Sequence, residues 1–268
     1  MEMSGQFISP IGQFSSPLTL AQEAVDRPLA AFSHDYPPGH DTGRHRHGRA
    51  QLLYATAGVM RIGTGGSSWI VPPGRALWMP AGEVHTVRTE GLVAMRALFF
   101  RGDAAQVGPS AAAVLAIAPL LRELVLAACA LPLEWDPEGR GGHLAALILD
   151  EIVTAQVLPL GVPEGSDSRL RRVTAGLRAR PADPRPLELW ASTAGASVRT
   201  LARLFREETG LGFAAWRQQL RLAEAAALLA AGLSPAQAAA RVGYVSASAC
   251  GAAFRDAFGH TPGSPPRG

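Results

Sequence analysis

Three histidines in the first third of the chain could bind a metal ion or a small effector. His45 and His47 are separated by one residue, so in a strand their side chains point to the same face. His85 lies in a later apolar stretch, and Gln51 follows His47 closely. If neighbouring strands bring these side chains together, they can hold one divalent transition metal, because imidazole is a ligand for Zn, Fe, Ni, Cu and Mn.

Three interpretations of these histidines stay open on the residues alone. In the first, they form a metal centre, although Gln51 offers a neutral amide where an anionic ligand would bind more strongly. In the second, they line a metal-free polar pocket, and the nearby Arg44, Arg46 and Arg49 favour an anionic effector over a cation. In the third, they only form hydrogen bonds inside a folded domain.

A second set of candidate residues lies in Leu187–Gly210, near the start of the C-terminal third. Gly195 can supply a tight turn, and Ser197 can cap a following helix. The apolar residues of that helix should pack inward: Val198, Leu201, Leu204 and Phe205. The outward face then carries Arg199, Thr200, Arg203 and Arg206. A supporting helix, a turn and a helix with outward donors are the layout of a helix-turn-helix.

The same pattern recurs in Ser234–Gly259. Ser234-Pro235 is typical of a helix start, Gly243 of a turn, and Ser246 of a cap for the next helix. The predicted inward face of that helix contains Cys250, Ala253, Phe254 and Ala257. A helix over 213–231 would hold the two units at a fixed separation.

The charge of the chain is concentrated in one part. Residues 1–163 contain 11 Arg and 14 Asp or Glu, whereas residues 164–268 contain 14 Arg and 8 Asp or Glu; no Lys is present. A basic, arginine-rich C-terminal third indicates an anionic partner, and arginine suits both phosphate and guanine. The two cysteines, Cys129 and Cys250, exclude a disulfide framework. With no secretory signal or membrane span expected, we predict a cytoplasmic protein.

Turn signals and apolar spacing predict an α+β multidomain chain. Residues 1–20 should be an irregular tail, and residues 21–108 a β-barrel of short strands. Residues 109–163 should be a helical connector, with helices over 113–130 and 143–157 and a linker from 158. Residues 164–268 should form an all-α domain with two helix-turn-helix units.

The C-terminal third resembles the AraC family of bacterial regulators. The resemblance covers about residues 168–265. The matching pieces are Ser197-x-Arg199-x-Leu201-x-Arg203-x-Phe205, Glu207-Glu208-Thr209-Gly210, Arg221-Leu222-x-x-Ala225, Val242-Gly243-Tyr244, Ser246-x-Ser248 and Phe254-Arg255-x-x-Phe258-Gly259-x-x-Pro262. It implies that both second helices enter successive major-groove segments of double-stranded DNA. The implied base-facing positions are Arg199, Ala202 and Arg203, then Ala247, Ser248, Gly251 and Ala252; Thr200, Arg206 and Arg255 are further DNA-binding candidates.

The second unit departs from the family in ways that weaken base reading. Alanine and glycine have no hydrogen-bonding side chain, so Ala247, Gly251 and Ala252 cannot read base edges by hydrogen bonds. Cys250 stands where the family often has Phe. We therefore predict a looser second unit that serves more for positioning on the DNA backbone.

The N-terminal region resembles the cupin β-barrel in its two signature motifs. They are Gly39-x5-His45-x-His47-x3-Gln51-x6-Gly58 and Gly74-x5-Pro80-x-Gly82-x2-His85-x3-Thr89. Gln51 replaces the usual Glu, and Thr89 the usual Asn. The resemblance implies a barrel that senses a signal, with His45, His47, Gln51 and His85 as its metal or effector residues.

Together these patterns predict a sequence-specific DNA-binding transcription regulator, activator or repressor, that responds to a small-molecule effector or a metal. The expected partners are double-stranded DNA, a second copy of the chain that contacts it through residues 113–157, and RNA polymerase if the protein activates. No Ser-His-Asp or Cys-His nucleophile arrangement is evident. Two alternatives stay open, namely a metal-dependent cupin enzyme with an accessory helical domain and a binding protein without DNA contact.

Overall fold

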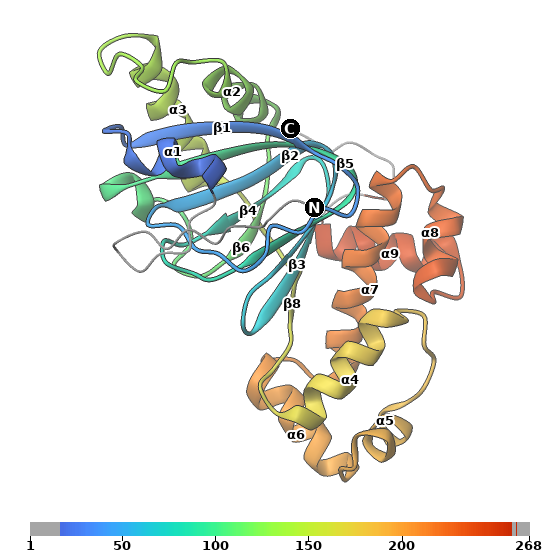
Figure 1. Cartoon of the computed structure of the whole chain (residues 1–268). Helices are drawn as coiled ribbons and strands as arrows, with labels where there is room; N and C mark the ends of the chain where they lie inside the picture. The colour runs from blue at the N-terminus through green and yellow to red at the C-terminus, as the bar shows by residue number, and fades with distance from the viewer. Residues whose placement is uncertain (1–16, 259–260, 262–268) are drawn as a thin grey trace, which may run out of the picture. The chain divides into compact units, whose positions relative to one another are not determined.

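The computed structural model describes residues 17–258 and 261, which form two compact units (Figure 1). The N-terminal unit comprises residues 17–64 and 71–158. The C-terminal unit comprises residues 65–70 and the described chain from 159 onward. No helix among the described residues has both the length and the apolarity needed to span a membrane.

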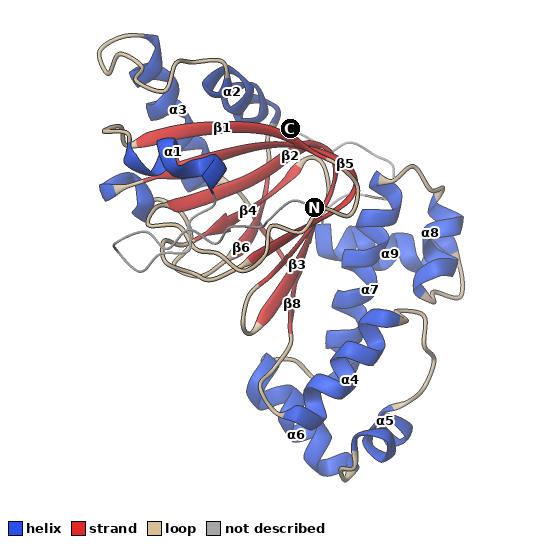
Figure 2. Ribbon diagram, viewed as in Figure 1, coloured by secondary structure: helices blue, strands red, loops and turns tan. Residues whose placement is uncertain are grey.

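The N-terminal unit is built on an antiparallel sheet (Figure 2). Its hydrogen-bonded order is β1 (Leu29–Tyr36), β5 (Thr86–Phe100), β2 (Ala50–Gly63), β4 (Arg75–Met79), β6 (Ala113–Ala116) and β7 (Val157–Leu158). This path begins at β1 and ends at β7, so pairing among the described residues does not close the predicted barrel. Short helical segments complete the unit at η1 (Pro17–Thr19), α1 (Leu20–Ala24) and η2 (Gly102–Gln106).

The two faces of this sheet have different surroundings because side chains alternate along each strand. One face packs against α2 (Pro119–Cys129) and α3 (Arg140–Thr154) in a continuous apolar core. Its members from the sheet include Leu52, Tyr54, Trp78, Leu98 and Phe100. The alternate residues face the other way, and among them Gln51 of β2 is the cross-strand partner of Phe99. That second face is the one on which the histidine cluster is built.

Two stretches of this region differ from the sequence-based expectation. Residues 17–20, the described part of the irregular tail predicted over 1–20, are helical, whereas residues 1–16 lie outside the described residues; residues 113–116 form a strand where we predicted a helix. The apolar run 113–117 has no periodicity that separates a buried strand from a buried helix. Pro119 then starts α2, since proline is well tolerated in the first helical turn. The predicted connector 109–163 therefore also contributes β6 and β7 to the sheet.

The C-terminal unit contains six helices among its described residues. They are α4 (Ser168–Ala179), α5 (Leu187–Ala194), α6 (Val198–Thr209), α7 (Phe213–Ala230), α8 (Pro235–Val242) and α9 (Ala247–Phe258). The central helix α7 buries Trp216, whose ring lies edge-on to Phe205 of α6.

A two-stranded ladder precedes these helices, where we predicted a linker. Residues 67–69 of β3 (Ser67–Val71) pair with β8 (Gly161–Pro163). The indole N–H of Trp216 donates to the carbonyl of Pro163 over 2.6 Å, and the Gln219 amide donates to that of Gly161. These bonds fix β8 to α7, and the compact C-terminal unit includes the described chain from Pro159 onward.

Candidate functional site

The structure brings His45, His47 and His85 into one buried cluster. His45 and His85 face each other across a backbone bridge, with N–H to O distances of 2.9 and 2.8 Å in the two directions. Their ring centroids are 4.3 Å apart, and His47 lies 5.0 Å from His45 and 5.6 Å from His85. One ligand nitrogen from each ring lies within 4.8 Å of the others. The predicted convergence of the three side chains is thus present.

The Nδ1 atom of each ring is held by an acceptor from the protein. The acceptors are the Gly43 carbonyl for His45 at 3.0 Å, the Glu23 carboxylate for His47 at 2.8 Å, and the Glu83 carbonyl for His85 at 3.0 Å. Because these oxygens can only accept, each Nδ1 carries a proton, and a ring in its neutral form then has its lone pair on Nε2. A carboxylate or carbonyl behind each imidazole is the usual support of a metal-binding histidine.

Burial keeps two of these rings neutral. Removal from water, with a smaller contribution from the neighbouring His45, lowers the pKa of His85 to about 3. Burial is also the main cause of the lowered pKa of His45. Neutral imidazoles are what a metal ion requires, since a protonated ring has no lone pair to donate.

Gln51 shares the sheet face that carries the cluster. Its cross-strand partner Phe99 lies edge-on to the His47 ring, with centroids 5.1 Å apart. The Oε1 atom of Gln51 and the Nε2 atom of His85 are both buried and have no hydrogen-bond partner in the described structure. An unsatisfied buried polar atom costs about 1–3 kcal/mol, so both atoms fit a ligand that accepts their lone pairs.

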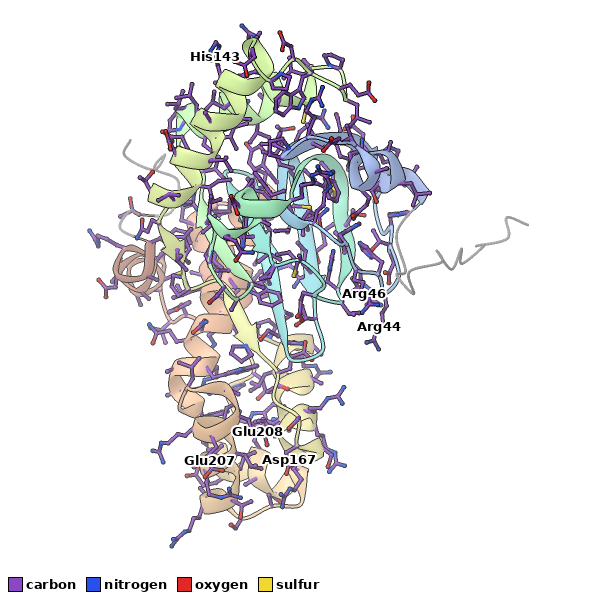
Figure 3. The ribbon with its side chains drawn as sticks, turned by 90° about the vertical axis from the view of Figure 1, so that its left-hand side faces the viewer. Arg44, Arg46, His143, Asp167, Glu207 and Glu208 are labelled. Atoms are coloured by element: carbon purple, nitrogen blue, oxygen red, sulfur yellow. The ribbon has the colours of Figure 1, made fainter. Side chains whose placement is uncertain are left out.

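Glu23, which sequence reasoning missed, and Arg49, for which it predicted a different role, support the cluster. Glu23 reaches His47 from α1, far away in sequence and in a segment with no motif to mark it. Arg49 is buried and donates to the carbonyls of Glu23, Val25 and Arg27, which fixes that segment. Arg49 is therefore engaged with backbone, whereas Arg44 and Arg46 extend toward the surface (Figure 3).

The first helix-turn-helix unit consists of α5 and α6. Gly195 ends α5 with φ +68°, and the Ser197 hydroxyl accepts from the Thr200 N–H at 3.1 Å, as predicted for turn and cap. The buried face of α6 contains Leu201, Leu204 and Phe205. We predicted that Val198 would pack inward. This prediction is wrong, because Val198 lies at the first position of the helix and is 40% exposed.

The outward face of α6 carries the predicted donors. Arg199, Arg203 and Arg206 are exposed, and Thr200 and Ala202 are half-buried. Arg203 pairs with Glu207 one turn later on the same helix. At the end of the helix, Glu208 accepts from the Ser166 hydroxyl at 2.9 Å and from the Asp167 N–H at 3.0 Å, close to the start of α4 (Figure 3).

The second unit, α8 and α9, repeats this local geometry. Ser234 and Gln237 form a reciprocal capping box, Gly243 ends α8 with φ +84°, and the Ser246 hydroxyl accepts from the Ala249 N–H at 3.1 Å. Cys250 and Phe254 are buried, whereas Ala253 and Ala257 are half-buried. The predicted base-facing positions lie on the outer side: Ala247, Ser248, Ala252 and Arg255 are exposed and Gly251 is half-buried.

Comparisons with known proteins agree with these two sites. Residues 29–136 match the family described as the AraC-like ligand binding domain, and residues 190–264 match a helix-turn-helix domain. The regulator NimR of Escherichia coli is 32% identical over 82% of this chain and 80% of its own length. RipA of Corynebacterium glutamicum is 38% identical over 44% of this chain and 34% of its own.

A solved structure of ToxT from Vibrio cholerae is similar over 88% of this chain and 95% of that one, at 9% identity and a TM-score of 0.37. The two family matches fall one in each unit, and both relatives are named as transcriptional regulators. A ligand-binding unit, two helix-turn-helix units and relatives that are regulators and not enzymes lead to one assignment: the chain belongs to the AraC family of transcription regulators.

Proposed function

We propose that this regulator acts in the cytoplasm, binds its operator with α6 and α9, and responds to a divalent transition metal held by His45, His47 and His85. Gln51 is the proposed fourth ligand. The single observation that supports a bound metal is that the Nδ1 atom of each of the three rings donates to a protein acceptor. Their three Nε2 lone pairs are left to a ligand within the buried cluster.

The donor set suits an ion such as Zn²⁺, Ni²⁺ or Cu²⁺. The four proposed ligands are neutral, and Glu23 supplies a negative charge behind His47. When bound, the ion would satisfy the buried lone pairs of His85 and Gln51. Glu23 belongs to α1, so occupation of the cluster would also fix the position of the segment that Arg49 holds.

A small organic effector on the same sheet face is the second candidate. Alternate residues of β1 form a row of rings, with His34 and Tyr36 centroids 4.5 Å apart and Tyr36 stacked on His40 at 4.7 Å. Phe99 connects this row to the cluster, since it lies edge-on to both Phe32 and His47. Such a row suits a planar ligand, with or without a metal beside it.

Homodimerisation is part of the proposal. The helices α2 and α3 expose the apolar side chains of Leu120, Leu147 and Val153. A second copy that covers them would link two DNA-binding units and raise their effective concentration on adjacent sites. RNA polymerase would be a further partner if the regulator activates.

Metal analysis of the full chain, purified without an affinity tag, tests the proposal. We expect about one transition-metal ion per chain, lost in His47→Ala. Glu23→Gln should bind the ion more weakly by about 10–100-fold, because it removes the charged support behind His47. His143→Ala is the matched control, since His143 lies on α3 outside the cluster (Figure 3).

Two results would contradict metal binding at the histidine cluster. One is a protein that carries no ion and whose melting temperature does not change with added Zn²⁺, Ni²⁺, Co²⁺, Cu²⁺, Mn²⁺ or Fe²⁺. The other is an ion retained in full by His47→Ala. If His85→Ala then abolished the transcriptional response without change in the affinity of the C-terminal unit for DNA, the organic effector would be favoured.

A further inference from the structure

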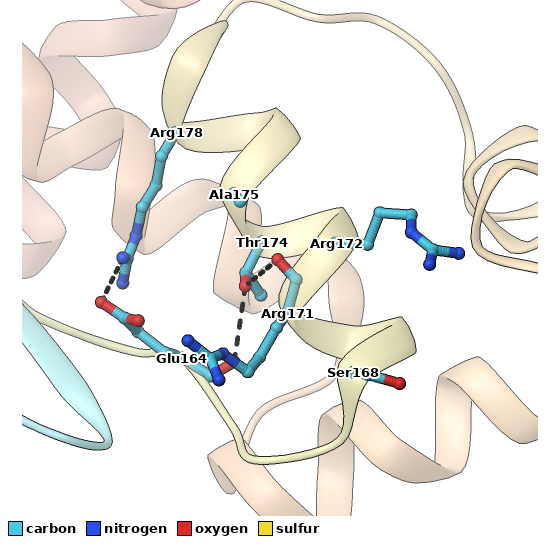
Figure 4. A pocket seen from close by; sticks show the side chains of 7 residues that line it. All are labelled: Glu164, Ser168, Arg171, Arg172, Thr174, Ala175 and Arg178. Carbon is cyan, nitrogen blue, oxygen red and sulfur yellow. Dashed lines mark hydrogen bonds and ion pairs between the residues drawn. The ribbon is translucent and has the colours of Figure 1, made fainter.

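The outward face of α4 forms a basic groove that no residue of α6 or α9 lines (Figure 4). Its lining residues come from α4 and from the chain before it: Glu164, Ser168, Arg171, Arg172, Thr174, Ala175 and Arg178. Ser168, Arg171, Arg172 and Ala175 are exposed at helical spacing, so they form one solvent-facing surface of α4, which we call the α4 face.

The negative charges near the α4 face are already paired. Glu164 forms an ion pair with Arg178, and Asp167, which caps α4, pairs with Arg169. Arg171 has no side-chain partner in the described structure. The face therefore presents the uncompensated positive charge of Arg171 and Arg172 to solvent.

Arg171 extends toward Glu164 on one side of α4, whereas Arg172 points to the other side, next to the first helix-turn-helix turn (Figure 4). The Arg172 guanidinium donates to the carbonyl of Ala194 over 3.2 Å. Ala194 is the last residue of α5, and Gly195 begins the turn that leads into α6. In a helix-turn-helix the N-terminal residues of the second helix contact base edges, so the DNA backbone passes close to this turn.

From this placement we propose that the α4 face is a third DNA contact, which binds a backbone phosphate beside the segment read by α6. The inference rests on DNA binding by the C-terminal unit. It adds a contact outside the helix-turn-helix family match, which begins at residue 190. The small side chains of Ser168 and Ala175 leave space for a phosphodiester strand to approach, and a guanidinium fork matches phosphate oxygens.

A phosphate contact has a signature that base reading lacks. It weakens binding to every sequence alike when removed, and it lowers the dependence of affinity on salt. The phosphate contact can therefore be tested without an identified operator. The measurement is binding of the full chain to a mixed-sequence DNA duplex over a range of salt concentrations.

Arg171→Ala is the central variant, since its side chain holds no structural partner. We expect binding about two- to fivefold weaker at low salt, and a slope of log affinity against log salt that is smaller by about 0.9. Arg180→Ala is the matched control: it removes an equal charge at the exposed end of the same helix, outside the groove. Its slope should stay close to that of the unaltered chain.

Ala175→Glu tests the same face by repulsion. Ala175 is exposed on a helix, so the variant should keep its melting temperature while it binds DNA more weakly than Ala175→Gln. Equal slopes for Arg171→Ala and the unaltered chain would overturn the third contact. An unaltered chain that does not bind duplex DNA at all would instead contradict the proposed function.

Discussion

The two helix-turn-helix units share one backbone design and present different chemistry to DNA. Both end the supporting helix at a glycine with positive φ, Gly195 in one and Gly243 in the other. Both cap the second helix with a serine hydroxyl, from Ser197 and Ser246. Outward, α6 carries Arg199, Arg203 and Arg206, whereas the predicted base-facing residues of α9 are two alanines, a serine and a glycine.

This difference shows that folding and recognition depend on separate residues within one motif. The turn, the cap and the buried face define the motif, and both units keep them. The outward face is free to vary, so one unit can read bases through arginine forks while the other fits the groove by shape and positions the chain on the backbone.

The largest expected difference between the units is in the two turns. A β-carbon added at Gly243 would lie 2.8 Å from the Cα of Ala182 and 3.1 Å from its carbonyl oxygen, whereas one at Gly195 meets nothing within 4 Å. Both substitutions place alanine at positive φ, which costs about 1–2 kcal/mol. We expect Gly243→Ala to lower the free energy of unfolding by about 2–4 kcal/mol, because of the added backbone clash.

Urea unfolding of both variants measures this difference, with Gly195→Ala as the matched control. An equal loss of unfolding free energy in the two variants would mean that the turn at Gly243 has room to relax. The two units would then be more alike in packing than their geometry indicates.

The two units should also differ in DNA recognition, by a smaller free energy than in the stability of their turns. Arg203→Ala should weaken operator binding by about 1–3 kcal/mol and relax sequence preference at one position, if this side chain reads a guanine edge. Ser248→Ala in α9 should cost less, because a serine hydroxyl reads bases with less discrimination than a bidentate arginine. An operator is first selected with the full chain. Competition between variants of that operator then measures the affinity and the sequence preference of both substituted proteins.

One control variant accompanies this measurement. Arg241→Ala removes an exposed positive charge from the supporting helix α8, at a residue that is not a DNA-binding candidate, so it shows the loss expected from charge alone. If Arg203→Ala changed neither affinity nor preference, α6 would not be the reading helix.

The caps should give the smallest difference, because here the units are built alike. Ser197→Ala and Ser246→Ala should each cost about 1 kcal/mol of stability, since each removes one acceptor from a helix N-terminus. Thermal unfolding of the two variants tests the equality. A cost at Ser246 well below that at Ser197 would support the looser second unit that the sequence of α9 predicts.

The C-terminal unit could be predicted from sequence to a greater extent than the N-terminal one. Turn glycines, capping serines and apolar spacing act locally, so Gly195, Ser197 and the face of Leu201 were all identifiable from the printed chain. Val198 shows the limit: it follows the cap in the first turn, where an apolar residue has no neighbouring helix turn to pack against.

In the N-terminal unit the important relations are distant in sequence. The pairing of His45 with His85 was predicted because two motifs marked it. No local signal could indicate Glu23 behind His47, or the strand at residues 113–116, since both depend on which segments meet in the folded sheet. The assignment of metal-binding or DNA-reading roles to single residues stays a prediction.

The ladder of β3 and β8 has a consequence for building chimaeric regulators from this chain. The C-terminal unit takes residues 65–70 from a hairpin far upstream, so the polypeptide passes between the units three times, after residues 64, 70 and 158. A graft that joins a foreign sensor at residue 164 would leave behind β8 and the carbonyls that Trp216 and Gln219 use. A chimaera therefore has to include the hairpin residues 65–70 together with the C-terminal segment, so a single junction along the gene is not sufficient.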